Sequence, residues 1–279
     1  MPKRLARAAA LLVVLFVLSH ASFRGVLFPW SPVRPGYAAT AFPGGTIVYP
    51  ARGGLPAAYR DAGALLDEVE RANRLAFRKD VTVVVAGDWG LFVRGSLLGW
   101  KGRPLPVLGS ALQTGTVVYL SPLAREPGRD MAGVLKHELT HALMFQRMPL
   151  RRTFELVRLD WFEEGLAVRA GNPGDYFDDA AFARWAAHPG YRFGPWGDPE
   201  LERLPEALRG VFRLTEYRVF IDFLVDRYGE DRFFAFRDRV LADPARHEAA
   251  FAGVLGTRFA DAVAAFEAAV RAGAWPRVP

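Results

Sequence analysis

Residues 137–141 read His-Glu-Leu-Thr-His, and residues 161–167 read Trp-Phe-Glu-Glu-Gly-Leu-Ala. On an α-helix, His137 and His141 stand one turn apart and only about 40° from each other, so both imidazoles can bind one metal ion. Glu138 lies beside them, close to the ion but not coordinating it. The first stretch therefore predicts a metal site built on one helix.

The surrounding residues favour that helix. Apolar side chains recur at three- and four-residue spacing from 130 to 146, with Asp130 as the expected N-cap and Pro149 beyond the end. The alternative is that both histidines are ordinary surface residues of a helix and that Glu138 is a solvated charge.

A third ligand is still required, because a tetrahedral catalytic zinc takes three protein ligands and leaves one position open for water. The second stretch supplies a candidate, Glu164. The chain has no cysteine, so thiolate ligands and disulfides are excluded and the site must be built from histidine and carboxylate.

The two stretches together resemble the gluzincin zinc metallopeptidases, in particular the bacterial peptidase MA-like domain family, and more distantly their thermolysin-like and aminopeptidase branches. In that group the glutamate directly before the glycine of W-x-x-E-G-x-A is the third zinc ligand, which corresponds to Glu164 and not to Glu163. The resemblance implies a zincin-like fold, one Zn²⁺ ion and hydrolysis of peptide bonds. The interval between His141 and Glu164 is longer than in the aminopeptidases, and we expect a lengthened loop at 147–156.

Glu138 suits the chemistry of amide hydrolysis. Zinc lowers the pKa of a bound water to about 7 and polarises the scissile carbonyl. A carboxylate beside the metal can accept the proton of that water and return it to the leaving amine. Glu138 is thus the expected general base and acid.

A hydrogen-bond donor usually helps to stabilise the oxyanion of the tetrahedral intermediate. Tyr217, at the entry to an apolar helical stretch, is the best candidate, because related sequences use a tyrosine or histidine of a downstream helix. A buried structural tyrosine is the alternative. Arg218 and His188 are further candidates.

Two other carboxylates lie near the expected ligand. Glu163 points about 100° away from Glu164 on a helix, so both cannot face one ion from the same turn. We expect Glu163 to be solvated or to lie in the second coordination shell. Asp160 either accepts the free N–H of a zinc-bound histidine or caps the helix that carries Glu164.

The N-terminus indicates export. Lys3, Arg4 and Arg7 precede an apolar run at 8–18, and small residues follow at 19–21. Residues 1–21 are therefore a signal peptide or an N-terminal membrane anchor, with a plain buried helix as the third possibility. We expect an extracytoplasmic protein, secreted or tethered to the membrane by this segment, and a linker or surface arm at 22–44.

Residues 45–279 are expected to form a single domain, whose first half, 45–150, holds a small sheet and the zinc helix. The pattern predicts strands at 45–49, 81–86 and 115–120, and a helix at 55–77. The strand at 115–120 is expected to form the sheet edge to which an extended peptide adds, or else an ordinary core strand.

A glycine-containing segment, 95–109, is expected to form a mobile loop that can gate the cleft. The second half, 151–279, is expected to be mainly helical, which gives an α+β fold with a substrate cleft between the halves and the zinc helix on its floor. The expected helices are 178–187, 205–228 with a break near Gly210, 230–241, 248–255 and 260–272.

Composition is consistent with a folded enzyme. The chain has 279 residues, 51% of them hydrophobic, and a net charge of +6 spread without long basic runs. We expect a monomer that acts on a peptide or protein, has no nucleic-acid site and can associate with a membrane through its N-terminal segment.

Two other classes of function remain open. One is a catalytically inactive zincin-fold protein of the cell envelope that binds a partner or peptide. The other is an envelope module without metal. The chain has all three expected ligands and Glu138 together, which weighs against both alternatives, because neither of them requires the complete set.

Overall fold

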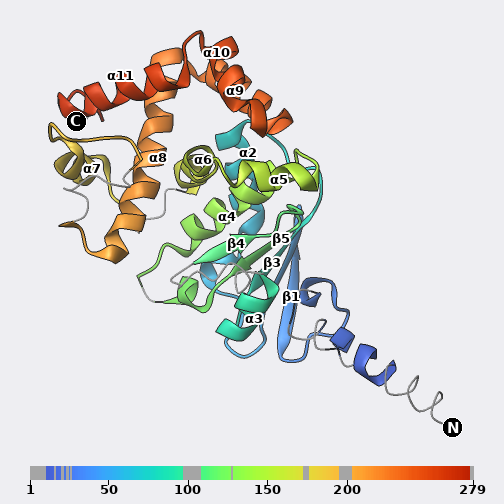
Figure 1. Ribbon diagram of the computed structural model, residues 1–279. Coiled ribbons are helices and arrows are strands. Elements are labelled where there is room, and N and C mark those ends of the chain that lie inside the picture. The colour runs from blue at the N-terminus through green and yellow to red at the C-terminus, as the bar shows by residue number, and fades with distance from the viewer. Residues whose placement is uncertain are drawn as a thin grey trace.

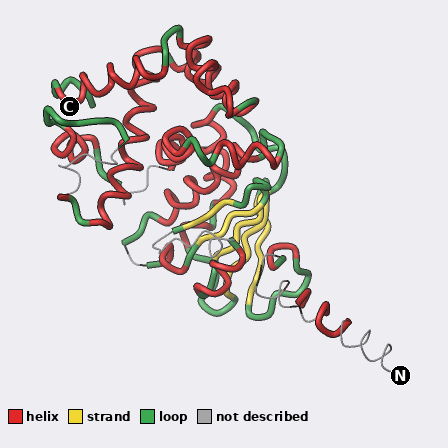
Figure 2. The backbone as a smooth tube through the Cα atoms, viewed as in Figure 1, coloured by secondary structure: helices red, strands yellow, loops and turns green. Residues whose placement is uncertain are grey.

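A five-stranded mixed sheet forms the N-terminal half of the computed structural model, which describes residues 11–15, 17–19, 22, 25, 27–96, 108–126, 128–171, 176–194 and 203–276. The strands lie side by side in the order β1-β2-β3-β5-β4. They are β1 (Tyr37–Phe42), β2 (Gly45–Pro50), β3 (Val81–Val85), β4 (Gly109–Ala111) and β5 (Val117–Leu120). The small sheet and the mainly helical remainder confirm the predicted α+β class (Figures 1 and 2).

The sheet is mixed because its two outer strands run against the others. β2, β3 and β5 are parallel, with Val48 opposite Val84 and Thr82 opposite Val117. β1 and β4 pair antiparallel to β2 and β5. The three parallel strands are the three that the sequence predicts, since strands buried on both faces read as continuous apolar runs.

The outer strand β1 corrects the expectation of a linker or arm at 22–44. Tyr37–Phe42 pairs with β2 through a tight turn in which Gly44 has a φ of 86°. Its side chains are exposed or half-buried. An outer strand of this kind carries little of the apolar alternation that marks a half-buried strand, so the sequence pattern did not reveal it.

Of the two alternatives for the strand at 115–120, the structure bears out the core strand and not the edge strand. β5 lies between β3 and β4, and all four of its residues are buried. The outer strand on this side is the three-residue β4, which lies against α4. β4 begins at the end of the expected loop 95–109, of which residues 97–107 lie outside the described residues.

Helices cover both faces of the sheet. α2 (Ala62–Asn73) and α4 (Met131–Phe145) pack on one face in the main core, which includes Leu66, Leu139 and Val83. The other face holds a smaller core with α3 (Trp89–Gly95) and the 3₁₀ turn η1 (Phe28–Trp30), whose Phe28 is 1% exposed. In place of the single helix expected at 55–77, the structure has the short turn η2 (Ala57–Tyr59) followed by α2.

The segment after α4 is helical instead of a simple loop. α4 ends with Gln146 as its C-cap, and α5 (Leu150–Leu156) begins directly after Pro149. Proline fits the N-terminal boundary of a helix because its fixed φ and missing N–H cost nothing there. The expected lengthened loop 147–156 is therefore mostly α5.

The C-terminal half consists of helices whose positions agree with the sequence pattern. They are α6 (Asp160–Gly171), α7 (Asp179–Ala186), α8 (Glu206–Tyr228), α9 (Glu230–Ala242), α10 (His247–Leu255) and α11 (Phe259–Arg271). α8 is continuous through Gly210, so the expected break is wrong; a glycine costs a helix only about 1 kcal/mol, which tertiary packing can outweigh. α9, α10 and α11 lie on the side of α6 away from the sheet (Figure 1).

The N-terminal segment is described at 11–15, 17–19 and 22, where it is helical. By length and composition, none of the described helices could cross a membrane alone, and one bent pair, Pro244–Leu255 with Phe259–Arg271, passes such a test jointly.

Candidate metal centre

Three side chains from two helices converge on one point. Nε2 of His137 lies 3.1 Å from Nε2 of His141. Oε2 of Glu164 lies 3.3 Å from Nε2 of His137 and 3.7 Å from Nε2 of His141. Both histidines come from α4, and Glu164 comes from α6. The structure therefore brings together the three ligands that the sequence predicts.

These spacings fit a tetrahedral metal ion. Zinc binds histidine nitrogen and carboxylate oxygen at about 2.0–2.2 Å, so neighbouring ligand atoms in a tetrahedron stand about 3.3–3.6 Å apart. The three measured distances cluster around that value, and the ligand atoms all lie within 4.8 Å of one another. Two imidazoles and one carboxylate also form the donor set of catalytic zinc sites that keep one position open.

α4 holds its part of the site rigidly because it is enclosed. His137, Glu138 and His141 are 8%, 6% and 7% exposed, and the apolar residues around them are buried as well. At the start of the helix, Asp130 accepts a hydrogen bond from the backbone N–H of Gly133, as the N-cap prediction expects. At its end, the amide of Gln146 bonds the backbone at 78–79 and 115.

The C-terminal end of α6 lies close to α4. A Cβ on Gly171 would lie 2.7 Å from the carbonyl oxygen of Gly133 and 3.0 Å from the backbone nitrogen of His137. Only glycine permits that approach. The contact fixes how far Glu164 stands from the two histidines.

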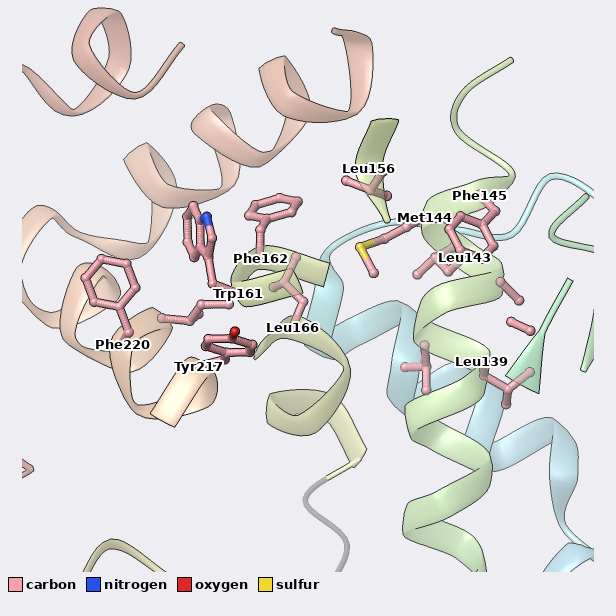
Figure 3. Close-up of a cluster of buried hydrophobic side chains, with 14 of the residues drawn as sticks. Leu139, Leu143, Met144, Phe145, Leu156, Trp161, Phe162, Leu166, Tyr217 and Phe220 are labelled. Atoms are coloured by element: carbon pink, nitrogen blue, oxygen red, sulfur yellow. The ribbon is translucent and has the colours of Figure 1, made fainter. Parts of the chain in front are cut away.

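The aromatic residues of the second stretch anchor α6 in the core. Trp161 packs on Phe220 at 5.4 Å and on Phe259 at 5.1 Å between ring centroids, and Phe162 is fully buried against Phe236. Figure 3 shows both rings on the side of α6 away from α4. Glu164 is thereby left facing the histidines.

The glycine of the second stretch permits another close crossing. A Cβ on Gly165 would lie 2.8 Å from the carbonyl oxygen of Tyr217 and 2.6 Å from Cδ1 of Ile221. α8 therefore crosses α6 directly beside Glu164. This crossing explains why glycine follows the predicted ligand.

Glu138 lies between the histidines and the outer strand of the sheet. A Cβ on Gly109 of β4 would lie 2.5 Å from Cγ and 2.7 Å from Oε1 of Glu138. Burial raises the pKa of Glu138 above its usual value, against the opposing effect of His137 and His141. The carboxyl group is thus desolvated and beside the ligand cluster without belonging to it.

Glu163 faces the other edge of His141. Its Oε1 lies 3.0 Å from Nδ1 of His141, and its side chain is 7% exposed. Of the two expectations for Glu163, solvation is therefore wrong. The expected hydrogen bond from a ligand histidine to Asp160 is not observed, because Nδ1 of His137 and Nδ1 of His141 both lack a hydrogen-bond partner in the described part of the chain. The carboxylate nearest to Nδ1 of His141 there is that of Glu163. Asp160 is the first residue of α6.

Charge pairing governs protonation in the cluster. Burial alone would favour the neutral form of His141, but Glu163 and Glu164 outweigh it and raise the pKa of His141 well above its usual value. Burial would also favour neutral Glu164, but hydrogen bonds from His137 and His141 hold its pKa well below its usual value.

Tyr217 lies on α8 in the layer behind the ligands. It is 7% exposed, and its ring packs 6.0 Å from that of Phe193. Figure 3 shows the Tyr217 ring next to α6. Burial raises the pKa of Tyr217 to about 12; Arg213 opposes the shift, and the Glu164 carboxylate is among the acidic groups that add to it. The hydroxyl is therefore protonated at neutral pH.

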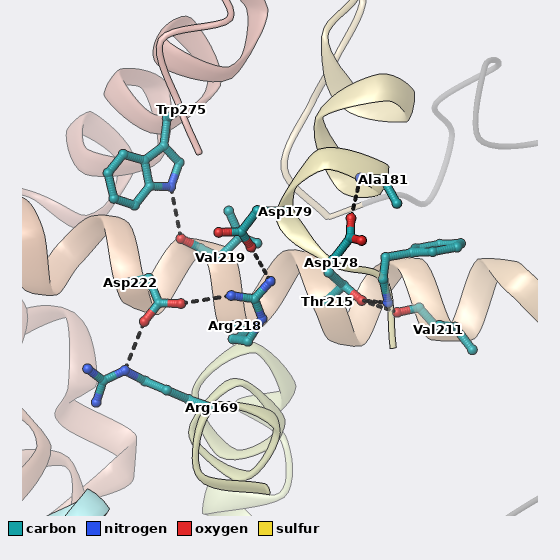
Figure 4. A network of polar contacts seen from close by, with 11 residues as sticks. Arg169, Asp178, Asp179, Ala181, Val211, Thr215, Arg218, Val219, Asp222 and Trp275 are labelled. Carbon is teal, nitrogen blue, oxygen red and sulfur yellow. Dashed lines mark hydrogen bonds and ion pairs between the residues drawn. The ribbon is translucent and has the colours of Figure 1, made fainter. Parts of the chain in front are cut away.

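The other two candidate donors have different surroundings. The guanidinium of Arg218 is held by Asp222 at 3.1 Å and Asp179 at 2.5 Å, and Asp222 also accepts from Arg169 of α6 (Figure 4). This network ties α6, α7 and α8 together. His188 follows α7, with its ring 6.3 Å from that of Tyr191.

Two residues near the ligands escaped the sequence reasoning. The ring of Tyr176 lies 6.2 Å from that of His137, tilted by 30°. Gly109 touches the predicted general base, as described above. Neither position shows a spacing or motif that links it to residues 137–141, because both contacts arise only when distant segments pack together.

Comparison with known proteins gives a limited picture. No protein-family model matches the chain, and no curated protein matches it. Among solved structures, it is similar to a two-domain M1 zinc metallopeptidase mutant bound to L-tryptophan, with a TM-score of 0.42 and 16% identity. It is also similar to an M1 zinc metallopeptidase mutant from Deinococcus radiodurans bound to a Tyr-Ser-Ala substrate, with a TM-score of 0.41 and 16% identity. Each match covers 87% of this chain, which spans about half the length of those proteins, 52%.

Proposed function

We propose that this protein is a zinc-dependent metallopeptidase of the gluzincin type, with one Zn²⁺ held by His137, His141 and Glu164. The observation that carries the proposal is the set of distances between the three ligand atoms, 3.1, 3.3 and 3.7 Å, which match the edges of a tetrahedral zinc site. A buried carboxyl group, Glu138, stands next to that cluster, where a general base is needed.

Each residue then has a separate task. Zinc at this site would supply a water of pKa about 7 and polarise the scissile carbonyl. Glu138 accepts the proton of the attacking water and delivers it to the leaving amine as the C–N bond breaks. Desolvation helps both proton transfers, because it raises the pKa of Glu138 toward neutral pH. A group whose pKa lies near the working pH can both accept and donate a proton.

Tyr217 is our proposed donor to the oxyanion. Its hydroxyl keeps its proton throughout the neutral range because burial raises its pKa to about 12. At Gly165, α6 crosses α8 beside Glu164. About one turn further along α6, Arg169 binds Asp222 of α8, which also binds Arg218. The position of Tyr217 is thus linked to that of the third ligand.

We place the substrate along β4. This strand is the outer one on its side of the sheet, and its Gly109 touches Glu138. An extended peptide that pairs with the free edge of β4 would pass next to the general base. Peptides and unfolded protein segments are therefore the proposed substrate class.

We also propose an extracytoplasmic location, with residues 1–21 directing the chain to the membrane. The described apolar side chains between Leu11 and Leu18 are 49–67% exposed, whereas Phe28, a few residues later, is buried against the sheet. Apolar side chains so exposed suit a lipid environment better than water. Fractionation of cells that produce the full chain tests this, together with the N-terminal sequence of the product; an uncleaved chain in the soluble cytosolic fraction would contradict it.

The test of function combines metal content with hydrolysis. We expect one zinc per chain by elemental mass spectrometry, its loss in Glu164→Ala, and full retention in the control Glu248→Ala, which alters an exposed glutamate. Cleavage of a quenched peptide library should disappear in Glu138→Gln while zinc remains. Zinc without turnover on any unfolded substrate would favour the inactive binding protein, and no zinc after reconstitution would favour the metal-free module.

A further inference from the structure

Glu163 is a buried carboxylate that the proposed reaction does not use. It lies on α6 directly before the proposed ligand Glu164, and only 7% of its side chain is exposed. Burying a carboxylate is costly unless it is paired and hydrogen-bonded. Its contact at 3.0 Å is with Nδ1 of His141, the ring nitrogen that does not face the ligand cluster.

The two adjacent glutamates contact the same imidazole from opposite edges. Oε1 of Glu163 lies 3.0 Å from Nδ1 of His141, and Oε2 of Glu164 lies 3.7 Å from Nε2. Successive residues on a helix point about 100° apart, so they cannot both approach one ion, but they can reach two edges of a ring that lies between them. The crossing of α6 over α4 puts His141 in that position.

The two proposed histidine ligands are therefore not equivalent. A carboxylate oxygen of Glu163 lies 3.0 Å from Nδ1 of His141, whereas no described carboxylate forms an ion pair with Nδ1 of His137. Both Nδ1 atoms are buried, and neither has a partner with hydrogen-bond geometry within the part of the chain that the structure describes. A metal-bound histidine that donates its other N–H to a carboxylate is held in one tautomer and one ring orientation, and it becomes a more basic ligand.

We propose that Glu163 is the positioning residue of the metal centre: it accepts the Nδ1–H of His141 and so fixes Nε2 of this histidine toward the metal. The inference rests on the proposed function only in requiring that the site binds zinc. Glu163 does not coordinate the ion and takes no part in proton transfer to the substrate. It makes His141 the stronger of the two histidine ligands.

Three variants separate this role from a general loss of charge. Glu163→Gln keeps an oxygen that can accept the N–H but removes the charge. Glu163→Ala removes the acceptor altogether. Asp160→Asn removes a negative charge from the same helix without altering the residue that faces His141.

The first measurement is the zinc dissociation constant, obtained by competition with a chromophoric chelator, together with the melting temperature of each metal-free protein. Loss of such a carboxylate partner typically weakens metal binding 10–100-fold. We expect about that loss in Glu163→Ala, a smaller loss in Glu163→Gln, and a change of less than about threefold in Asp160→Asn. The same order should hold in a Glu138→Gln background, where no hydrolysis takes place.

The second measurement reads the tautomer directly. Long-range ¹H–¹⁵N spectra of the zinc-loaded protein should show His141 protonated at Nδ1 in the wild type, and that resonance should shift or vanish in Glu163→Ala. A merely structural role would lower the melting temperature without changing either zinc affinity or this resonance.

The outcomes are distinguishable. Wild-type protein that binds no zinc would overturn the proposed function itself. Wild-type binding with an unchanged dissociation constant in folded Glu163→Ala would overturn the role of Glu163 and leave the proposed function in place. Should Glu163→Ala fail to fold, an unchanged dissociation constant together with an unchanged His141 resonance in Glu163→Gln would overturn that role.

Discussion

Gly109→Ala is predicted to displace the proposed general base without removing the metal. The added Cβ would lie 2.5 Å from Cγ and 2.7 Å from Cδ and Oε1 of Glu138. Carbon atoms pack at about 3.5–4.0 Å, so Glu138 or β4 must move by about 1 Å. The backbone is not the cause, since Gly109 is not among the glycines with positive φ. Without the clash, alanine would stabilise this strand slightly.

The expected size follows from that overlap. Overpacking a buried site costs about 1–3 kcal/mol, which lowers the melting temperature of a domain this size by about 2–12 °C. A misplacement of about 1 Å at a reacting group lowers kcat about 100-fold. Zinc content should stay at the wild-type level, because the three atoms nearest the new methyl group all belong to Glu138 and none belongs to a proposed ligand.

The assay compares kcat, zinc content and melting temperature in Gly109→Ala and in Ser110→Ala. Ser110 neighbours Gly109 on β4, and strand geometry points its side chain to the opposite face. The control should therefore keep near wild-type values. A Gly109→Ala protein with unchanged kcat and unchanged melting temperature would refute the contact between β4 and Glu138 and the substrate path drawn from it.

Four further predictions concern the same centre. Glu138→Gln should bind zinc normally and lose about 10²–10⁴-fold in kcat, measured on the peptide library, because the amide cannot accept a proton; equal activity would remove Glu138 from the mechanism. Tyr217→Phe should lower kcat about 10²–10³-fold with little change in KM. Since the pKa of Tyr217 is about 12 and the donor must be protonated, its contribution should persist as pH rises and be lost only near that value, so a pH profile with an alkaline limb below pH 10 that disappears in Tyr217→Phe would contradict this. Trp161→Ala should cost about 3–5 kcal/mol of unfolding free energy in denaturant titrations, because it empties an aromatic cluster; a loss below 1 kcal/mol would show that Trp161 does not anchor α6. Chelation should lower the melting temperature and re-addition of zinc should restore it, since an ion that binds only the folded chain stabilises it by mass action; an unchanged value would argue against a bound ion.

Local pattern was enough to predict much of the fold. The sequence predicts Asp130 as the N-cap of the helix that carries His137 and His141. In the structure that helix is α4 (Met131–Phe145), and Asp130 is its N-cap. α9 and α11 agree with the pattern to within one residue at either end. Helices of this length carry a repeating apolar spacing along one chain segment, so no knowledge of their neighbours is needed to find them.

The elements that the pattern missed depend on neighbours. β1 and β4 are outer strands that form by pairing with β2 and β5, and neither shows an apolar alternation of its own. β4 in turn displaces β5 from the edge of the sheet. α8 passes unbroken through Gly210 because a long helix packed against α6 outweighs the small local cost of one glycine.

The candidate site divides in the same way. The sequence alone determined that His137 and His141 share one face of a helix with Glu138 beside them, since that follows from helical periodicity, and its second motif nominated Glu164. Only the tertiary structure decided that the Glu163 carboxylate lies 3.0 Å from Nδ1 of His141, and that Gly109 touches Glu138. Those contacts depend on the distance and angle at which α6 and β4 meet α4, and close approaches between separate elements are set by packing of the whole chain.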